Sequence, residues 1–211
     1  MIENNQSLFE LFGSKVFRIP DYQRGYAWGE KQLSALWEDL EDIPEDNGEY
    51  KKHYTGTIFL KETAKIERWC KDTFYDVIDG QQLLTTISIL LYELLKSSPN
   101  GLSSTSREDL FKRYIAISNS TNDCKVYRLS YSRGPKNQNY EFLLSKIFED
   151  EKIILPSECQ NSYTNNLENA KNFFRVKIST LSHEEKEVLY NKLTTSLIFD
   201  LQISEVKDEQ T

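Results

Sequence analysis

The sequence is poor in the residues from which disulfide frameworks and metal centres are built. Its 211 residues include three cysteines, two histidines and one methionine. Cys70, Cys124 and Cys159 are far apart and form no CxxC pair, which is typical of a reduced cytosolic protein rather than a disulfide scaffold. Because His53 and His183 are the only histidines, a Cys/His zinc site is not expected.

Basic charge and long apolar runs are also scarce. Lys and Arg number 26 against 33 Asp and Glu, so the formal net charge is −7 at pH 7. DNA could therefore bind only through a local basic patch, not over the whole surface. The N-terminus lacks the apolar run of a signal peptide, and the most apolar stretch, residues 87–95, contains Tyr92 and Glu93 and is too short to cross a bilayer. We expect a cytoplasmic protein with no membrane partner.

Strand and helix patterns are abundant. Hydrophobic residues make up 38% and charged residues 28% of the chain, as in soluble globular proteins. Apolar residues with a period of 3.6 predict helices, whereas β-branched, aromatic or alternating stretches predict strands. The predicted strands are residues 15–19, 53–61, 74–78, 125–131 and 197–203. The predicted helices are residues 6–12, 30–42, 81–96, 106–115, 137–150 and 162–181, and one after the S-x-x-E capping box that starts at Ser182. Residues 44–52 and 62–73 are predicted to be polar connections.

The best internal boundary is the stretch "SSPNGLSSTS", residues 97–106, which is rich in turn-forming residues. We expect a small mixed-sheet domain over residues 1–97 and a mainly helical extension over residues 98–211. Because a good strand at residues 197–203 lies so close to the last residue, we also expect a C-terminal domain to follow in a longer protein.

The stretch "YDVIDGQQLLTT", residues 75–86, joins a buried strand, a glycine turn and a helix. The first turn of a helix has unpaired N–H groups and a positive dipole end, so it is a natural anion site. Gly80 permits a ligand to approach the backbone closely. Asp79 can cap the helix or bind a metal ion that is also coordinated by phosphates. Gln81, Gln82 and Thr85 add neutral hydrogen-bonding groups. The ordinary alternative is a turn and cap followed by core leucines, and the stretch is not a P-loop because GxxxxGK[ST] is absent.

The stretch "FRIPDYQRGYAW", residues 17–28, gathers aromatic and basic side chains on a loop. Pro20 ends the strand, and Arg24 can hold a phosphate or carboxylate with its guanidinium. Tyr22, Tyr26 and Trp28 could stack on a base or a modified nucleotide, and we expect Tyr22 and Trp28 to face the Asp-Gly turn. The alternative is that the aromatics pack on the helix at residues 30–42 and that Arg24 forms a salt bridge.

Considered together, "IPDYQRGYAW", "LWEDL", "HYTGTIFL" and "YDVIDGQQLLTTISIL", in this order and spacing, resemble the N-terminal domain of the GmrSD-type restriction proteins. The resemblance is strong over about residues 8–95 and continues as a helical layout to about residue 206. It implies an α+β fold, in which a small mixed β-sheet core of ParB/sulfiredoxin type carries packed helices and is followed by a mostly helical second half.

The resemblance also implies a function. Such domains are the nucleotide-binding, regulatory parts of bacterial anti-phage, modification-dependent (type IV) restriction systems. They are thought to bind and hydrolyse a nucleoside triphosphate with Mg²⁺ and to couple this to DNA cleavage by a C-terminal HNH-type nuclease domain or subunit. This chain contains no such nuclease domain. Modified phage DNA would be a further partner.

The family's Asp-Gly-Gln-Gln-Arg signature assigns roles to individual residues. It maps onto Asp79, Gly80, Gln81 and Gln82, and the family's Tyr-Gln-Arg segment maps onto Tyr22, Gln23 and Arg24. The resemblance implies that Asp79, Gln82 and Arg24 are catalytic, with Asp79 also binding the metal; that Gly80, Gln81, Thr85 and Arg18 bind the nucleotide; and that Tyr22, Gln23, Tyr26 and Trp28 form a pocket for a modified base or DNA.

One position departs from the family pattern. Where the family has Arg, this chain has Leu83, which cannot neutralise phosphate charge and instead joins the apolar stripe of Ile87 and Leu90. Either Arg24 or Arg18 compensates, or hydrolysis has been lost and only binding is kept. Two functions therefore remain open: an NTP phosphohydrolase part of a restriction system, and a non-catalytic module that recognises a nucleotide, a modified base or a protein partner.

Overall fold

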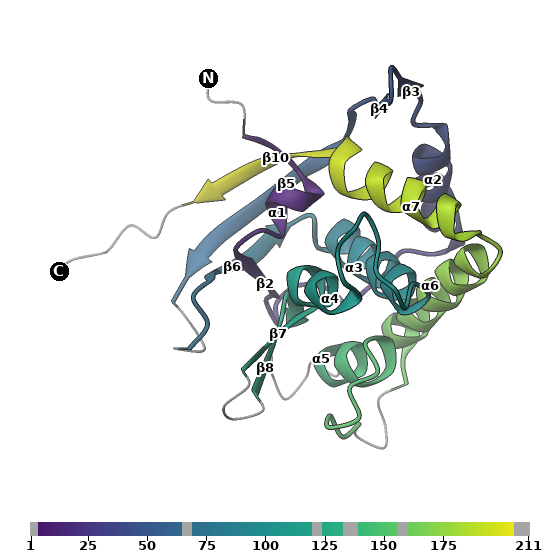
Figure 1. Cartoon of the computed structure of the whole chain (residues 1–211). Helices are drawn as coiled ribbons and strands as arrows, with labels where there is room; N and C mark the ends of the chain where they lie inside the picture. Colours follow the sequence, from purple (N-terminus) through teal and green to yellow (C-terminus); the bar gives the residue numbers. More distant parts are fainter. Residues whose placement is uncertain (1–3, 65–68, 120–123, 133–138, 156–159, 205–211) are drawn as a thin grey trace.

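The protein is a layer of helices packed on one face of a mixed β-sheet. The computed structural model describes residues 4–64, 69–119, 124–132, 139–155 and 160–204. Figure 1 shows the sheet on the left and the helices gathered to its right. The helices are α1 (Leu8–Leu11), α2 (Glu30–Asp42), α3 (Gln81–Lys96), α4 (Arg107–Tyr114), α5 (Asn139–Phe142), α6 (Ser162–Ser179) and α7 (His183–Asn191), with π-helical turns η1 (Leu143–Ile147) and η2 (Lys192–Ser196) after α5 and α7.

The main sheet has six strands in the order β1-β10-β5-β6-β2-β9. Parallel pairing joins β2 to both β6 and β9, and β10 to β5, whereas β5–β6 and β1–β10 are antiparallel. The mixed α/β class predicted from the sequence is confirmed, and the ParB/sulfiredoxin type stays a prediction. The strands of this sheet are β1 (Asn5–Ser7), β2 (Lys15–Ile19), β5 (His53–Thr63), β6 (Thr73–Asp79), β9 (Leu129–Tyr131) and β10 (Leu197–Ser204).

Both sides of the boundary at residues 97–106 contribute to this sheet. Strands β9 and β10 come from the C-terminal side, and one continuous apolar core runs from Leu8 to Leu201. The division of the chain at residue 97 stays a prediction, but the N-terminal residues complete their sheet only with strands from beyond it. Among the described residues, no helix combines the length and apolarity needed to span a membrane.

Four predicted segments differ from the structure. The helix predicted at residues 6–12 is the end of β1 followed by the short α1. The stretch 44–52 is not a plain loop but a small hairpin, β3 (Glu45–Asp46) and β4 (Glu49–Tyr50). The helix predicted at residues 137–150 is the short α5 followed by η1, and residues 133–138 lie outside the described part. The single strand predicted at residues 125–131 is two strands, β8 (Cys124–Tyr127) and β9, and β8 pairs with β7 (Ala116–Asn119), which the sequence did not indicate.

The break between β8 and β9 falls at Arg128, whose side chain is buried. Its Nη1 bonds to the Asp72 carboxylate and donates to the Lys15 carbonyl at 3.2 Å, and its Nε donates to the Lys112 carbonyl at 3.2 Å. The backbone of Arg128 accepts from the Phe17 N–H at 2.7 Å and donates to the Ile115 carbonyl at 2.8 Å. Because these partners come from three other segments of the chain, the alternation of apolar residues around Arg128 could not reveal the break.

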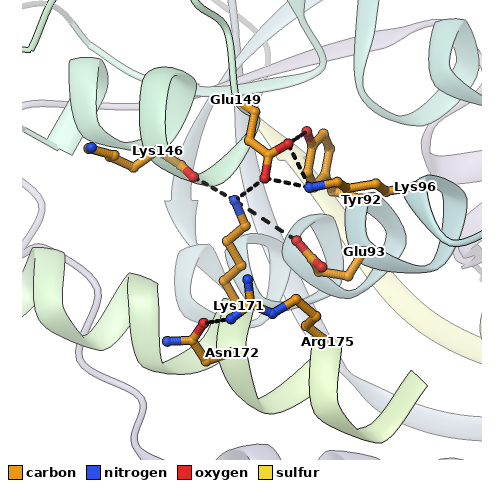
Figure 2. A network of polar contacts seen from close by, with 8 residues as sticks. All are labelled: Tyr92, Glu93, Lys96, Lys146, Glu149, Lys171, Asn172 and Arg175. Carbon is orange, nitrogen blue, oxygen red and sulfur yellow. Dashed lines mark hydrogen bonds and ion pairs between the residues drawn. The ribbon is translucent and has the colours of Figure 1, made fainter. Parts of the chain in front are cut away.

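Helix α3 is the centre of the core, as its sequence predicts. Thirteen of its sixteen residues are buried, including the polar Gln81, Thr85 and Glu93. Figure 2 shows how charged groups cross from α3 to α6 and to the segment after η1: Lys171 Nζ donates to Glu149 Oε1 at 2.8 Å and lies 4.0 Å from Glu93 Oε1. Lys96 completes the group with a 2.6 Å ion pair to Glu149. This network fixes the helical layer to α3, which in turn carries the candidate site at its first turn.

Candidate functional site

Two predicted motifs meet at one edge of the sheet. Because β2 and β6 are parallel, their carboxyl ends lie at the same edge, where ligands commonly bind in open sheets. The loop of residues 20–29 follows β2, and the Asp79-Gly80 turn follows β6 and leads directly into α3. We call the loop together with residues 79–82 the edge site.

Three glutamine side chains hold the edge site together. Gln82 Nε2 donates to the Gly25 carbonyl at 3.1 Å, and its Oε1 accepts from the Ala27 N–H at 2.7 Å. Gln23 Nε2 donates to the Ile78 carbonyl at 2.8 Å, and its Oε1 accepts from Gln81 Nε2 at 3.0 Å. This glutamine bridge, formed by Gln23, Gln81 and Gln82, brings the two motifs into direct contact. Both the oxygen and the nitrogen of the Gln82 amide are engaged by the loop backbone, so Gln82 is a positioning residue in this structure.

The start of α3 is a helix N-terminus without a side-chain cap. Gly80 is the N-cap and adopts a left-handed conformation with φ of 91°. A Cβ there would lie 3.2 Å from Ile58 Cγ1, so both the backbone angle and the close neighbour favour glycine. Asp79 is exposed and its Oδ1 accepts from the Gly80 N–H at 2.7 Å, so it holds the turn and does not cap the helix. The first N–H groups of α3 therefore have no side-chain acceptor among the described residues.

Gln81 adds a second unsatisfied group beside this helix start. Its side chain is 6% exposed, and its Nε2 donates to Gln23. Its Oε1 is buried and has no hydrogen-bond partner among the described residues. A buried acceptor without a partner costs free energy, and native proteins tend to keep such groups for a ligand or a functional purpose. The edge site thus combines backbone donors that have no side-chain acceptor with one buried acceptor that has no partner among the described residues.

The aromatic residues of the loop have different environments. Tyr22 is 70% exposed, whereas Tyr26 is fully buried and shares a 2.7 Å hydrogen bond between its hydroxyl and Thr86 Oγ1. Burial raises the pKa of Tyr26, so its phenol is neutral. Trp28 is half-buried and packs against the core. The stacking wall predicted from these three rings is therefore not formed by Tyr26, because no face of its ring is open to a base.

The basic and hydroxyl residues assigned to nucleotide binding also lie in different environments. Arg24 is exposed and forms no ion pair with any described residue, which makes it available to an anion at the edge site. Arg18, in contrast, pairs with Asp76 through Nε at 2.6 Å and projects from the side of β2 opposite to the buried Phe17 and Ile19. Thr85 is 1% exposed and lies beneath the turn. In this structure, Arg18 and Thr85 do not belong to the exposed part of the edge site.

Helix α6 supports the loop from behind, a contact that the sequence analysis missed. Asn166 Nδ2 donates to the Tyr26 carbonyl at 3.2 Å. A Cβ on Gly25 would lie only 2.4 Å from Tyr163 Cγ, so the loop backbone passes directly against the start of α6. These residues are about 140 positions apart in the chain, and no local pattern links them.

The edge site contains two exposed carboxylates, those of Asp21 in the loop and Asp79 in the turn. Within the described ranges, no group of three or more His, Cys, Asp and Glu side chains could hold a metal. Asp79 Oδ2 has no hydrogen-bond partner there, so one carboxylate oxygen is available. Mg²⁺ is commonly bound by one or two carboxylates together with waters and the phosphates of a nucleotide. The residues present therefore fit a Mg²⁺ ion that arrives with phosphates, and not a metal centre built by the protein alone.

The fold and the edge site define a mixed α/β protein with an exposed loop-and-turn site at the carboxyl ends of parallel strands. Residues 6–210 match the family described as the GmrSD restriction endonuclease, N-terminal domain. Because the match covers nearly the whole chain, the chain belongs to this family, as the sequence motifs predicted. Membership identifies the chain as part of a restriction system and implies a C-terminal nuclease as its partner. No curated protein matches the chain.

Proposed function

We propose that this chain is the nucleotide-binding, regulatory part of a modification-dependent restriction system. The observation that carries the proposal is the uncapped N-terminus of α3, which the glutamine bridge holds against the loop bearing Arg24. Free N–H groups at a helix start bind phosphate oxygens, and the helix dipole adds favourable electrostatic interaction. The ligand would be a nucleoside triphosphate with Mg²⁺.

Each residue of the edge site has a distinct role in this proposal. The first N–H groups of α3 bind the phosphates, Asp79 holds the Mg²⁺ that the phosphates carry, and Arg24 neutralises the remaining negative charge. Tyr22 is the exposed ring of the loop and stacks on the base. Gln82 keeps the loop in place through the Gly25 and Ala27 backbone.

Binding without turnover is the second function that the structure supports. Leu83 lies in the first turn of α3 and packs half-buried against the core, so it places no positive charge at the phosphates. Transition-state charge would then rest on Arg24 and the metal alone, and loss of a single charged donor typically slows such chemistry strongly. A chain that binds but does not hydrolyse would still serve as a regulatory module for the nuclease and as a reader of modified phage DNA.

A titration experiment tests the proposal directly. GTP and ATP are titrated calorimetrically, with and without Mg²⁺, into the native chain and into Leu83→Arg, Arg24→Gln and Arg107→Gln variants, and phosphate release is measured for each. Arg107→Gln is the matched control, because it removes the same charge from α4, where Arg107 lies 5.1 Å from the centre of the Phe111 ring.

We expect Mg²⁺-dependent binding by the native chain that weakens about ten- to a hundredfold in Arg24→Gln and is unchanged in Arg107→Gln. Phosphate release by Leu83→Arg alone would show that the native chain binds without turnover. Release by the native chain would make Arg24 the residue that stabilises transferred charge. If neither nucleotide binds to the native chain, the edge site is structural in this chain and the proposal is wrong.

A further inference from the structure

A cavity of about 380 Å³ is lined by residues of β2, β6, β8, β9 and α5. On β2, Phe17 and Ile19 are fully buried on the helix side, so the alternating Val16 and Arg18 project to the opposite side. Strand β8 forms one wall of the cavity. None of the lining residues belongs to the loop of residues 20–29 or to residues 79–82, so this outer cavity is distinct from the edge site.

The floor of the outer cavity is apolar. Val16, Phe74 and Val126 come from three different strands, pack together in a small core cluster and line the cavity. Tyr140 of α5 adds an aromatic side chain to the lining. Apolar side chains with a neighbouring ring suit a planar ring system, because aromatic and apolar side chains bind bases by stacking and burial.

Among the described residues that line the outer cavity, the two charged ones are both basic, although the whole chain carries a net charge of −7. Arg18 uses Nε for its 2.6 Å ion pair with Asp76, which leaves its two terminal nitrogens without a partner among the described residues. Lys125 lies 3.3 Å from Asp150 Oδ2. Neither carboxylate is among the described lining residues, so Asp76 and Asp150 orient the two cations from outside the cavity, and the terminal nitrogens of Arg18 stay available to an anion.

Two serine hydroxyls complete the set of donors. Ser130 sits next to Arg18 in the β2–β9 register, and Ser132 follows β9 directly. Both line the cavity, and neither hydroxyl has a hydrogen-bond partner among the described residues. Two basic groups and two hydroxyls around an apolar floor match the chemistry of a phosphate joined to a flat ring.

We propose that the outer cavity binds a nucleotide, with its phosphate held by Arg18 and Lys125 and its base on the apolar floor. The volume lies near the lower end of the range for small-molecule sites, so it admits one nucleotide and excludes a duplex. The nucleotide is either free in solution or turned out of a nucleic-acid strand, since both sources present the same phosphate and base.

The experiment uses the full chain and two probes, adenosine 5′-monophosphate and a single-stranded oligothymidylate. Binding is measured by calorimetry up to about 1 mM ligand. The site is then located with 8-azidoadenosine 5′-monophosphate by photo-crosslinking and peptide mapping. The variants are Arg18→Gln, Arg18→Lys, Lys125→Gln and the distant control Arg107→Gln. Because loss of Arg18 leaves Asp76 unpaired, thermal unfolding is recorded for each variant to check that it folds. Lys125→Gln provides a second variant at a half-exposed position.

We expect Arg18→Gln to weaken binding about ten- to a hundredfold and Lys125→Gln about tenfold, with Arg18→Lys intermediate and Arg107→Gln unchanged. Crosslinks should fall within residues 124–132 or at Tyr140. Binding of the monophosphate identifies a free nucleotide as the ligand, whereas binding of the oligothymidylate alone, with the same losses in the variants, identifies a strand-borne nucleotide. Absence of binding by both probes, crosslinks confined to the edge site or to other residues outside the outer cavity, or unchanged affinity in both Gln variants would overturn the proposal.

Discussion

Replacing Gly25 with alanine should break the contact between the loop of residues 20–29 and helix α6. The added Cβ would lie 2.4 Å from Tyr163 Cγ, 2.6 Å from its Cδ2 and 2.7 Å from its Cβ. Rotation of the Tyr163 side chain moves the first two atoms but leaves its Cβ in place. The backbone of the loop or of α6 must therefore shift, and the edge site shifts with it.

The expected loss of stability follows from this overlap. Overpacking of a buried site costs about 1–3 kcal/mol. A backbone shift would also lengthen the Asn166–Tyr26 and Gln82–Gly25 hydrogen bonds, now 3.2 and 3.1 Å, each of which contributes about 0.5–1.5 kcal/mol. We expect the free energy of unfolding to fall by about 2–4 kcal/mol, and Tm to fall by about 5–10 °C for a chain of this size.

A double-mutant cycle tests the cause of this loss. Urea unfolding is measured for the native chain, Gly25→Ala, Tyr163→Gly and the double variant. Tyr163→Gly removes all three overlapping atoms and should itself cost about 1 kcal/mol through helix propensity. The double variant should be about as stable as Tyr163→Gly alone, with a coupling energy of about 1–3 kcal/mol. If the two single losses simply add, the overlap with Tyr163 is not what makes glycine necessary at position 25.

Three further predictions concern the polar contacts. Gln82→Glu keeps the acceptor for the Ala27 N–H but places an oxygen against the Gly25 carbonyl. We therefore expect the free energy of unfolding to fall by about 1–2 kcal/mol and residues 20–29 to be cleaved faster by protease. A loop that is equally protected in the variant would contradict the bridging role of Gln82. Burial raises the pKa of Glu149, but hydrogen bonds from Lys171 and Lys96 outweigh it and lower the pKa to about 2. The stability that this carboxylate contributes is therefore present above its usual pKa of 4.5 and is lost as pH falls toward 2. Glu149→Gln should flatten the pH dependence of the unfolding midpoint in that range. Parallel curves for the native chain and the variant would argue against a stabilising role of Glu149. Arg128→Met should lower the free energy of unfolding by about 3–5 kcal/mol in urea titrations, because it leaves Asp72 and two carbonyls without a donor. A loss below about 1 kcal/mol would show that water replaces the guanidinium.

The sequence predicted best the elements whose pattern is local. Strand β2 and helix α2 have the predicted bounds, Lys15–Ile19 and Glu30–Asp42, because apolar alternation and the i, i+3, i+4 spacing within each segment determine which face is buried. The division at Arg128 and the hairpin with β7 could not be predicted in this way. The division depends on hydrogen bonds from Arg128 to residues in distant parts of the chain, and the hairpin depends on the pairing of β8 with a neighbouring segment; no single-segment pattern contains either.

The site shows the same division between local and distant causes. The glycine turn before α3 was predicted because Asp-Gly followed by a helical period is a local pattern. The bridging role of Gln82 depends on the backbone of a loop more than fifty residues earlier, so it could not be predicted. The direction of the Arg18 side chain can be predicted from the sequence, because the apolar Phe17 and Ile19 on either side of it indicate that Arg18 points away from the core.

The position of β10 in the sheet has a consequence for synthesis of the chain. In the described sheet, β10 is the last strand in sequence, yet it lies between β5 and β1, and β1 has no other neighbour. At ordinary elongation rates, roughly 10 to 30 s pass between synthesis of β5 and synthesis of β10. During that interval the edge of β5 is open to pairing with other chains, including a second nascent copy. Ribosome-bound chains stalled before residue 197 should therefore aggregate more readily, and be cut more readily by protease, than chains extended by a linker until β10 has left the ribosomal exit tunnel.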